Sequence, residues 1–261
     1  MPTAERMPLA AARMSDRLDF RGGFLERARE FRRRYQGPEG LPWIKRVNHP
    51  LGAVLAMPLT PTQVSPNMVT LAGLLVHLVG ALIVGFLAPP THWLVVLLVI
   101  ALWQLAFSLD CADGQLARAR GQTSAFGAWL DQMSDGIAHG AVYGSLILYT
   151  VRALDLDALA ATLLASVAIP LTLMQTFTTW QRAAVIGGGR PVGERPSPML
   201  LLLYGFRSLL DYGAFLFIAS LLLLWPVGLL VFLLVMSAVN ALYVIAQVGL
   251  AWRLHLRGDR Q

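Results

Sequence analysis

Long apolar runs recur along this 261-residue chain, and the short segments between them carry most of the charges and helix-breaking residues. Apolar runs of about 17–25 residues are long enough to cross a bilayer as α-helices. The pattern predicts six of them, at about residues 66–88, 92–109, 124–151, 156–179, 209–224 and 227–251. We therefore expect an all-α integral membrane protein with six transmembrane helices, held in one domain over residues 61–252.

Residues 1–60, ahead of the first apolar run, have a different character. The stretch ERAREFRRRY at 26–35 is rich in arginine and is followed by the breaker QGPEG. It is either a helix on an anionic membrane surface or a partly disordered arm that marks the cytoplasmic side. Residues 41–59 mix apolar and basic side chains, which predicts an amphipathic helix at the membrane interface. At the other end of the chain, residues 253–261 are expected to form a short cytoplasmic tail.

Local signals mark the helix ends near the most polar part of the chain. Ser65 followed by Pro66 is typical of a helix start, with the serine as N-cap. Gly121 is predicted to end the second span, and Thr123 or Ser124 to cap the next one. The segment between these two helices is therefore expected to be a tight turn on one side of the membrane.

Composition supports the membrane assignment and argues against nucleic-acid binding. Hydrophobic residues make up 56% of the chain and charged residues only 14%, and the mean hydropathy is +0.58. The formal net charge is +6, but 20 of the 21 basic residues lie in the N-terminal arm, the tight turn, the 180–208 loop and the tail. By the positive-inside tendency, these segments and both termini face the cytoplasm, with only Arg152 opposite. The expected partner is the bilayer, and the preference for arginine over lysine indicates a bacterial inner (plasma) membrane.

Four aspartates stand out within this apolar chain. Asp110 and Asp113 are three residues apart and Asp131 and Asp135 are four apart, so each pair lies on one face of its helix. Two such faces meeting would form a cage of four carboxylates. Their negative charges would repel one another unless cations lay between them. Oxygen ligands without clustered His or Cys favour Mg²⁺ or Mn²⁺.

The aspartates belong to a longer pattern, D-x2-D-G-x2-A-R-x8-G-x3-D-x3-D. Its fixed positions are Asp110, Asp113, Gly114, Ala117, Arg118, Gly127, Asp131 and Asp135. The pattern resembles the signature of the CDP-alcohol phosphotransferase (CDP-alcohol phosphatidyltransferase) family. The resemblance implies a homodimeric enzyme of phospholipid biosynthesis that transfers a phosphatidyl or other phospho-alcohol group from a CDP-linked donor to an alcohol and releases CMP. The expected donor is CDP-diacylglycerol, with a soluble CDP-alcohol as the alternative.

The chemistry of that transfer suggests roles for the carboxylates. In-line attack on a pyrophosphate linkage develops charge that two divalent ions can spread over the attacking and leaving sides. Asp110, Asp113 and Asp131 are the expected metal ligands. Asp135 is the expected general base for the proton of the acceptor hydroxyl, and it also contacts a metal.

Small and polar residues around the aspartates are candidates for binding the nucleotide. Gly114, Ala117 and Gly127 would let it approach the helix backbone closely, although such residues also serve close helix packing. Arg118 would pair with a phosphate or neutralise an aspartate. The resemblance also implies that Asn67 and Thr70 of the first span contact the nucleotide. Their alternative role is to cap this span and to hydrogen-bond a neighbouring helix. The predicted nucleotide-binding residues are Asn67, Thr70, Asp113, Gly114, Ala117, Arg118 and Gly127.

The acceptor side rests on three arginines after the fourth span. Arg182, Arg190 and Arg195 are candidates for binding a phosphorylated acceptor such as inositol phosphate or glycerol phosphate, because arginine binds phosphate through paired hydrogen bonds. They are equally consistent with topology markers of the cytoplasmic side. Nearer the aspartates, His139 is expected to be a hydrogen-bonded neighbour of the metal site, and Cys111 a packing residue.

Two rival functions remain open on the sequence alone. A cation transporter could use the four aspartates as a permeation site, although these cluster at one membrane edge. A protein of the same family that has lost catalysis could act as a membrane scaffold, although the intact aspartates argue against this.

Overall fold

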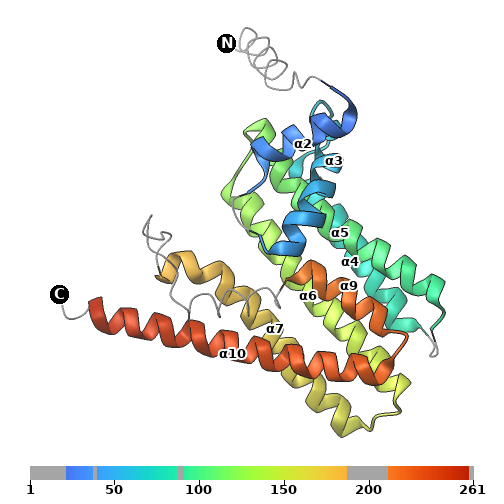
Figure 1. Ribbon diagram of the computed structural model, residues 1–261. Coiled ribbons are helices and arrows are strands. Elements are labelled where there is room, and N and C mark those ends of the chain that lie inside the picture. The colour runs from blue at the N-terminus through green and yellow to red at the C-terminus, as the bar shows by residue number, and fades with distance from the viewer. Residues whose placement is uncertain (1–21, 38–39, 88–90, 187–210, 259–261) are drawn as a thin grey trace, which may run out of the picture.

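The computed structural model describes residues 22–37, 40–87, 91–186 and 211–258, and every regular element within them is a helix. In chain order the elements are α2 (Phe24–Tyr35), a π-helical turn η1 (Ile44–Asn48), α3 (His49–Leu59), α4 (Pro66–Phe86), α5 (Trp93–Arg120), α6 (Ala125–Ala153), α7 (Ala158–Ile186), α9 (Tyr212–Leu222) and α10 (Pro226–Gly258). Figure 1 shows α4 packed along both α5 and α6, with α2 and α3 at one end and α10 crossing α7 at the other. The all-α prediction is confirmed.

Four helices in the described part of the chain are long and apolar enough to cross a membrane. They are α4, α5, the Ala158–Thr179 part of α7 and the Pro226–Gly249 part of α10. Helix α6 has 29 residues but carries Asp131 and Asp135. Helix α9 is apolar but only 11 residues long, a rise of about 16 Å. The chain is thus a membrane protein, and the count of six spans stays a prediction.

The predicted helix ends near the polar turn agree with the structure. The Ser65 hydroxyl accepts from the Met68 N–H at the start of α4, with Pro66 in the first turn. Helix α5 ends at Gly121, whose φ of 65° is a left-handed conformation that glycine adopts without strain. Of the two candidate caps for α6, Ser124 takes the role by accepting from the Gly127 N–H at 3.0 Å. These helix ends could be predicted from the sequence because each depends on only three or four neighbouring residues.

Helix α7 continues further than the apolar pattern predicted. The expected end was near residue 179, and the helix runs to Ile186 because the stretch WQRAAVI contains no breaker. Arg182 therefore lies in the last turns of α7, where a loop position was expected. Arg190 and Arg195 lie outside the described residues.

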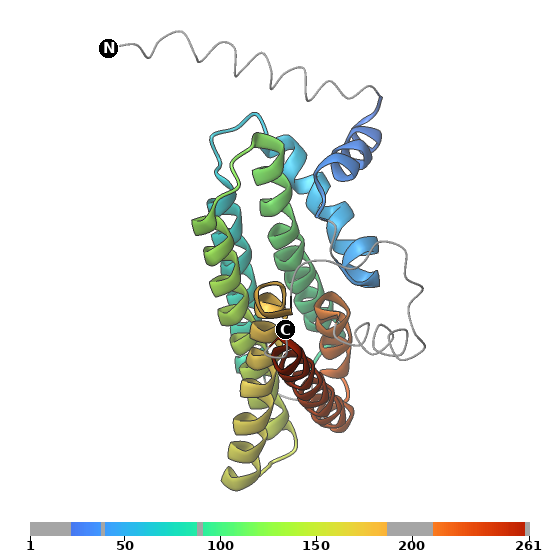
Figure 2. The same ribbon diagram turned by 90° about the vertical axis from the view of Figure 1, so that its left-hand side faces the viewer.

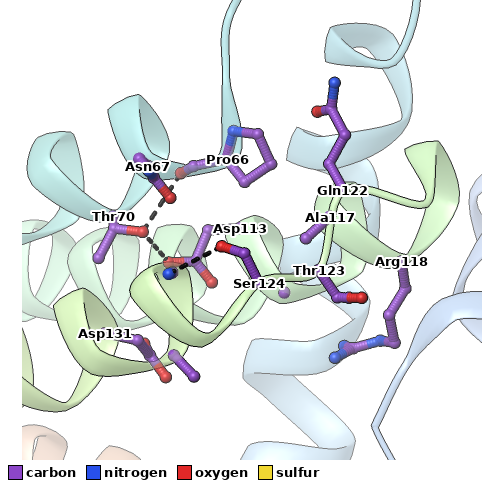
Figure 3. A pocket seen from close by; sticks show the side chains of 13 residues that line it. Pro66, Asn67, Thr70, Asp113, Ala117, Arg118, Gln122, Thr123, Ser124 and Asp131 are labelled. Carbon is purple, nitrogen blue, oxygen red and sulfur yellow. Dashed lines mark hydrogen bonds between the residues drawn. The ribbon is translucent and has the colours of Figure 1, made fainter.

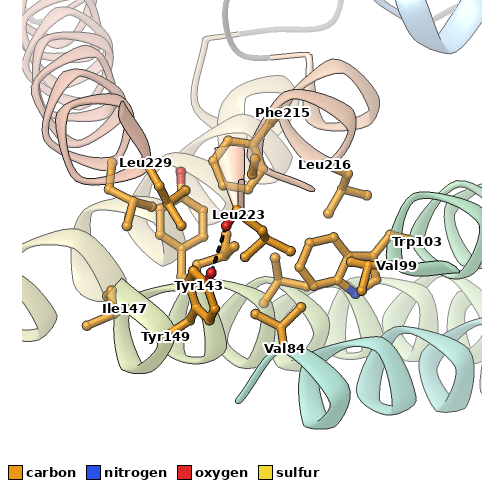
Figure 4. Packing of buried hydrophobic residues seen from close by; sticks show 14 of the residues in the cluster. Val84, Val99, Trp103, Tyr143, Ile147, Tyr149, Phe215, Leu216, Leu223 and Leu229 are labelled. Atoms are coloured by element: carbon orange, nitrogen blue, oxygen red, sulfur yellow. Dashed lines mark hydrogen bonds between the residues drawn. The ribbon is translucent and has the colours of Figure 1, made fainter. Parts of the chain in front are cut away.

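The largest hydrophobic cluster among the described residues joins α4, α5, α6, α7, α9 and α10 (Figure 4). Trp103 on α5 is fully buried at its centre, and its indole N–H donates to the His77 carbonyl at 3.3 Å. Gly80 on α4 makes room for this ring, since a β-carbon at that position would lie 2.7 Å from Trp103 Cδ1. Nearby, the Tyr149 hydroxyl donates to the Leu223 carbonyl at 2.7 Å, so α6 is tied to the end of α9.

A second cluster packs the N-terminal helices onto the bundle. Phe31 and Ala28 of α2 are buried against α3 and against Leu116 of α5, while four of the five arginines of α2 are exposed. Of the two alternatives left open for residues 26–35, the structure has the helix, and its apolar side packs on protein. Residues 44–59, expected to lie in an interfacial helix, are helical throughout, as η1 followed by α3.

Polar contacts fix this N-terminal segment to α5 and α9. The Asp211 carboxylate, at the N-cap of α9, accepts from the Trp43 N–H at 2.8 Å. Gln104 on α5 accepts from the Trp43 indole at 3.1 Å and from the Asn48 amide at 3.2 Å, and donates to the Gly213 carbonyl at 2.8 Å. One glutamine thus connects three elements that lie far apart in sequence.

Two arginines secure the ends of α4. Arg120, in the last turn of α5, donates to the carbonyls of Leu59, Thr60, Thr62 and Val64, which form the α3–α4 turn. Figure 2 shows this turn beside the α5–α6 turn at the upper end of the molecule. Arg152 of α6 donates to the carbonyls of Gly85 and Leu87 at the opposite end. The basic residue that stood alone in the charge pattern therefore has a structural role as a cap for α4.

Candidate active site

The four aspartates lie on α5 and α6, next to the turn that joins these two helices. Helix α5 extends without a break through Asp110 and Asp113, and the cap at Gly121 reverses the chain so that Asp131 and Asp135 of α6 face them. The predicted cage thus depends on two uninterrupted helices and one short turn. Helix α4 packs against both α5 and α6 and so helps to fix the position of the carboxylates.

Three of the carboxylates form a compact group. Oxygen atoms of Asp110, Asp113 and Asp131 lie within 4.8 Å of one another, and Asp113 is the most buried, at 6% exposure. Asp135 lies outside this group of three, but it is adjacent to Asp110, as is Asp131. Asp110 is therefore the link between the three-carboxylate group and Asp135.

This donor set fits a divalent metal ion. Oxygen ligands on opposite sides of Mg²⁺ or Mn²⁺ lie about 4 Å apart, close to the separation within the group of three. Carboxylates are hard ligands that suit these ions, and no histidine or cysteine belongs to the group found among the described residues. Cys111 is not part of this group, and its β-carbon lies close to Gly52 of α3, which is consistent with a packing residue.

A pocket of about 190 Å³ opens between the carboxylates and the α5–α6 turn (Figure 3), and we call it the turn pocket. Asp113 and Asp131 form one side, and Gln122, Thr123 and Ser124 of the turn form another. Every residue expected to bind the nucleotide lines it: Asn67, Thr70, Asp113, Gly114, Ala117, Arg118 and Gly127. The structure thus brings together residues from α4, α5 and α6 that were grouped on sequence and resemblance.

Helix α4 contributes polar groups to this pocket. The Thr70 hydroxyl donates to Asp113 Oδ2 and lies 3.2 Å from the Pro66 carbonyl. Asn67 faces Gly127 across the pocket, and a β-carbon at position 127 would come within 3.4 Å of Asn67 Oδ1. Glycine at 127 therefore allows α4 and α6 to approach closely while keeping the pocket open.

Arg118 borders the same pocket beside Gly114. A β-carbon at Gly114 would lie 3.2 Å from Arg118 Nη1, so the guanidinium lies over the glycine. The Arg118 Nε–H donates to the Tyr35 carbonyl at the end of α2, which leaves the two terminal nitrogens near the pocket. Its described hydrogen bond is to a backbone carbonyl, and no ion pair with an aspartate is found among the described residues. This orientation suits an anionic ligand in the pocket.

Positive charge near the pocket also affects His49 of α3. Burial, followed by the charges of Arg118, Lys45 and Arg32, lowers the pKa of His49 from its usual value of 6.5. His49 is therefore neutral at neutral pH and adds no charge to this end of the molecule.

A second pocket, of about 170 Å³, lies on the other side of Asp135 among α6, α7, α9 and α10, and we call it the bundle pocket. Its polar lining consists of Asp135, His139, Tyr143, Thr172, Gln175, Thr176, Thr179, Tyr212 and Asn240. The carboxylates therefore lie between two pockets, with Asp113 and Asp131 on one side and Asp135 on the other.

Much of the bundle pocket was missed from the sequence. His139 is hydrogen-bonded as expected, with Nδ1 lying 2.9 Å from Thr176 Oγ1. The Asn240 amide donates to Thr172 Oγ1 at 3.0 Å, which joins α10 to α7. The sequence did contain a signal for this polar lining. Thr and Gln recur at 172, 175, 176 and 179, which lie on one face of an otherwise apolar helix.

Fold and site together define a polytopic membrane protein with a carboxylate site between two pockets at one end of its bundle. The CDP-alcohol phosphatidyltransferase family model matches residues 63–252. The chain belongs to this family, which confirms the resemblance seen in the aspartate pattern and favours a transferase over a cation transporter.

Two relatives of this chain are phosphatidylinositol phosphate synthases, and the match covers part of each protein. The chain is 33% identical over 144 residues to phosphatidylinositol phosphate synthase of Mycolicibacterium smegmatis, covering 54% of this chain and 60% of that protein. It is 32% identical over 169 residues to the Mycobacterium marinum protein of the same name, covering 61% and 64%. This chain therefore spans less than two thirds of the length of these relatives.

Solved structures support the fold. The crystal structure of Mycobacterium tuberculosis phosphatidylinositol phosphate synthase with CDP-DAG bound has a TM-score of 0.52 and 20% identity, covering 76% of this chain and 92% of that one. The same enzyme in complex with manganese and citrate gives a TM-score of 0.51 over 76% and 87%. At 20% identity, this structural similarity supports the fold and nothing further.

Proposed function

We propose that this chain is a metal-dependent CDP-alcohol phosphatidyltransferase that moves a phosphatidyl group from CDP-diacylglycerol to an alcohol and releases CMP. The observation that carries the proposal is the position of the carboxylates between two pockets. A transferase must hold donor and acceptor on opposite sides of the phosphorus that is attacked. A scaffold has no need of such a site.

The turn pocket is the proposed donor site. It holds uncharged hydrogen-bonding groups from Asn67 and Thr70, the backbone of Gly114, which carries no side chain, and the guanidinium of Arg118. These groups suit a nucleotide, because the small residues admit it closely and Arg118 can pair with a phosphate oxygen. The diacylglycerol chains of the donor would remain in lipid beside the bundle.

Asp110, Asp113 and Asp131 are the proposed ligands of Mg²⁺ or Mn²⁺, with two ions as the proposed number. When bound, the ions neutralise charge on the pyrophosphate and on the departing CMP. The finding that supports this is the group of three carboxylates within 4.8 Å, with Asp135 adjacent through Asp110.

The bundle pocket is the proposed acceptor site, with Asp135 as general base. The acceptor oxygen attacks the phosphorus of the phosphatidyl group, the bond from that phosphorus to the CMP oxygen breaks, and the acceptor proton passes to Asp135. The finding that supports this role is that Asp135 lines the bundle pocket. The new product keeps the phosphatidyl phosphate, so atoms and charge balance.

The proposed acceptor is a phosphorylated polyol such as inositol phosphate or glycerol phosphate. The names of the relatives favour the former. Positions 172, 175, 179 and 182 recur at helical spacing on α7, so Arg182 continues the face that lines the bundle pocket. Arg190 and Arg195 are proposed as further phosphate ligands from the segment that follows.

The membrane setting completes the proposal. The distribution of basic residues supports a bacterial inner (plasma) membrane with both termini and the site facing the cytoplasm, where soluble acceptors are available. Family resemblance supports a homodimer, which the mass of the detergent-solubilised protein would test.

The test is release of CMP by purified full-length protein in detergent with Mg²⁺ and CDP-diacylglycerol. Inositol 1-phosphate, glycerol 3-phosphate, serine and free inositol are supplied in turn, and the lipid product is identified by mass spectrometry. We expect CMP release that requires one phosphorylated polyol. Folded protein that releases no acceptor-dependent CMP from CDP-diacylglycerol or from soluble CDP-alcohols would favour the scaffold.

A further inference from the structure

Tyr212, the first residue of α9, carries a buried hydroxyl with no hydrogen-bond partner among the described residues. The residue lines the bundle pocket together with Asp135. A buried hydroxyl without a partner is unfavourable, and native proteins rarely retain one without a use for it. The hydroxyl is therefore available to bond a polar atom of a ligand in this pocket.

Other polar groups of the bundle pocket are already paired. The Tyr143 hydroxyl bonds with Thr172 and Asn240, and Thr176 bonds with His139 and with the Thr172 carbonyl. These groups form a network that joins α6, α7 and α10. Tyr212 is the hydroxyl in the pocket that this network leaves out.

The ring of Tyr212 is held firmly, so its hydroxyl has a defined direction. It packs edge-on against His139 at a centroid distance of 3.8 Å, and against Phe107 at 5.4 Å. Asp211 precedes it and is tied to the backbone of Trp43 at 2.8 Å, which fixes the start of α9. A side chain locked in this way can position a ligand without losing rotamer freedom on binding.

The hydroxyl also lies in the electrostatic reach of the reacting carboxylates. Asp135 and Asp110 both lie within electrostatic range of it. His139, on whose ring Tyr212 packs, follows Asp135 by one turn of α6. Tyr212 therefore lies beside the proposed general base, on the acceptor side of the carboxylates.

We propose that Tyr212 binds the acceptor alcohol, donating its phenolic O–H to an acceptor oxygen next to the hydroxyl that Asp135 deprotonates. This inference rests on the proposed function and adds a specificity-determining contact to it. An acceptor with a second oxygen beside the reacting hydroxyl, as in a polyol, satisfies Tyr212. A simple alcohol would leave it unpaired and bind less well.

The test compares Tyr212→Phe with Tyr149→Phe in the full-length protein. Phenylalanine at 212 keeps the packing on His139 and removes only the hydroxyl. We expect the KM for the polyol phosphate to rise about tenfold, with the KM for CDP-diacylglycerol and the melting temperature unchanged. Tyr149, whose hydroxyl bonds to the Leu223 carbonyl away from both pockets, should show the reverse, with lower stability and an unchanged acceptor KM.

A binding measurement separates this inference from the proposed function. Calorimetric titration of inositol 1-phosphate and glycerol 3-phosphate into wild-type and Tyr212→Phe protein reports acceptor affinity without turnover. Weaker binding to the variant supports the role of Tyr212 even if CMP release fails. Equal binding to both proteins, binding of neither ligand to wild type, or an equal rise in donor and acceptor KM would overturn it.

Discussion

The hydroxyl of Thr70 donates a hydrogen bond to Oδ2 of Asp113, which joins α4 to α5 at the wall of the turn pocket. Asp113 is the most buried of the three clustered carboxylates, and this bond uses one of its acceptor positions. It orients the carboxylate toward Asp110 and Asp131. A residue outside the aspartate pattern thus helps to set the geometry of the site.

Removing that hydroxyl should impair the reaction more than it affects the fold. We expect Thr70→Val to lower kcat/KM for CMP release by about 10- to 100-fold, the usual range when a partner that orients a metal ligand is lost. Thr70→Ser keeps the hydroxyl and should retain most of the activity. Equal activity of the valine and serine variants would show that the bond to Asp113 does not matter.

Arg120 is expected to be a stability residue that supports the site indirectly. Its guanidinium satisfies four carbonyls of the α3–α4 turn, just ahead of Asn67. Arg120→Gln should lower the free energy of unfolding by about 1–3 kcal/mol, because these carbonyls, of which that of Thr62 is exposed and the other three are partly buried, lose their donor. Thermal melting in detergent checks this.

The matched control for Arg120 is Arg33→Gln. Arg33 of α2 is exposed, and its contact with Glu30 is 3.9 Å long. Exposed ion pairs contribute little, so the control should melt near the wild-type temperature. If both variants melted alike, the α3–α4 turn would not depend on Arg120.

Gly80 is expected to tolerate no side chain. A β-carbon would lie 2.7 Å from Trp103 Cδ1, and the buried ring has no free space to move into. Gly80→Ala should therefore destabilise the protein by about 1–3 kcal/mol through overpacking. Gly144 on α6 has open space around its β-position, so Gly144→Ala is the control and should be neutral or stabilising. A neutral result for Gly80→Ala would contradict the close packing of α4 on α5.

Local sequence signals predicted the turn side of the site well. The caps at Ser65 and Ser124, the break at Gly121 and the spacing of the aspartates each involve a few adjacent residues. Helical periodicity then determined that Asp110 and Asp113 share a face. Those features place the carboxylates and the turn pocket with little need for long-range information.

The bundle pocket could not be predicted in the same way. It depends on how α7, α9 and α10 cross α6, which apolar spans of similar composition leave undetermined. The hydrogen bond from the Trp43 N–H to Asp211 joins residues 168 positions apart, and no local sequence pattern predicts it. Tyr212 was not predicted for the same reason, because its proposed role depends on its position beside Asp135 and His139.

The central claim is that the clustered carboxylates support metal-dependent transfer. Its most direct test is CMP release from CDP-diacylglycerol by wild-type protein and Asp131→Asn, each with Mg²⁺, with Mn²⁺ and with EDTA. We expect acceptor-dependent CMP release from wild type with either ion, its loss in EDTA, and a fall of at least about 100-fold in the folded variant. Release that persists in EDTA, or that Asp131→Asn retains in full, would contradict the account.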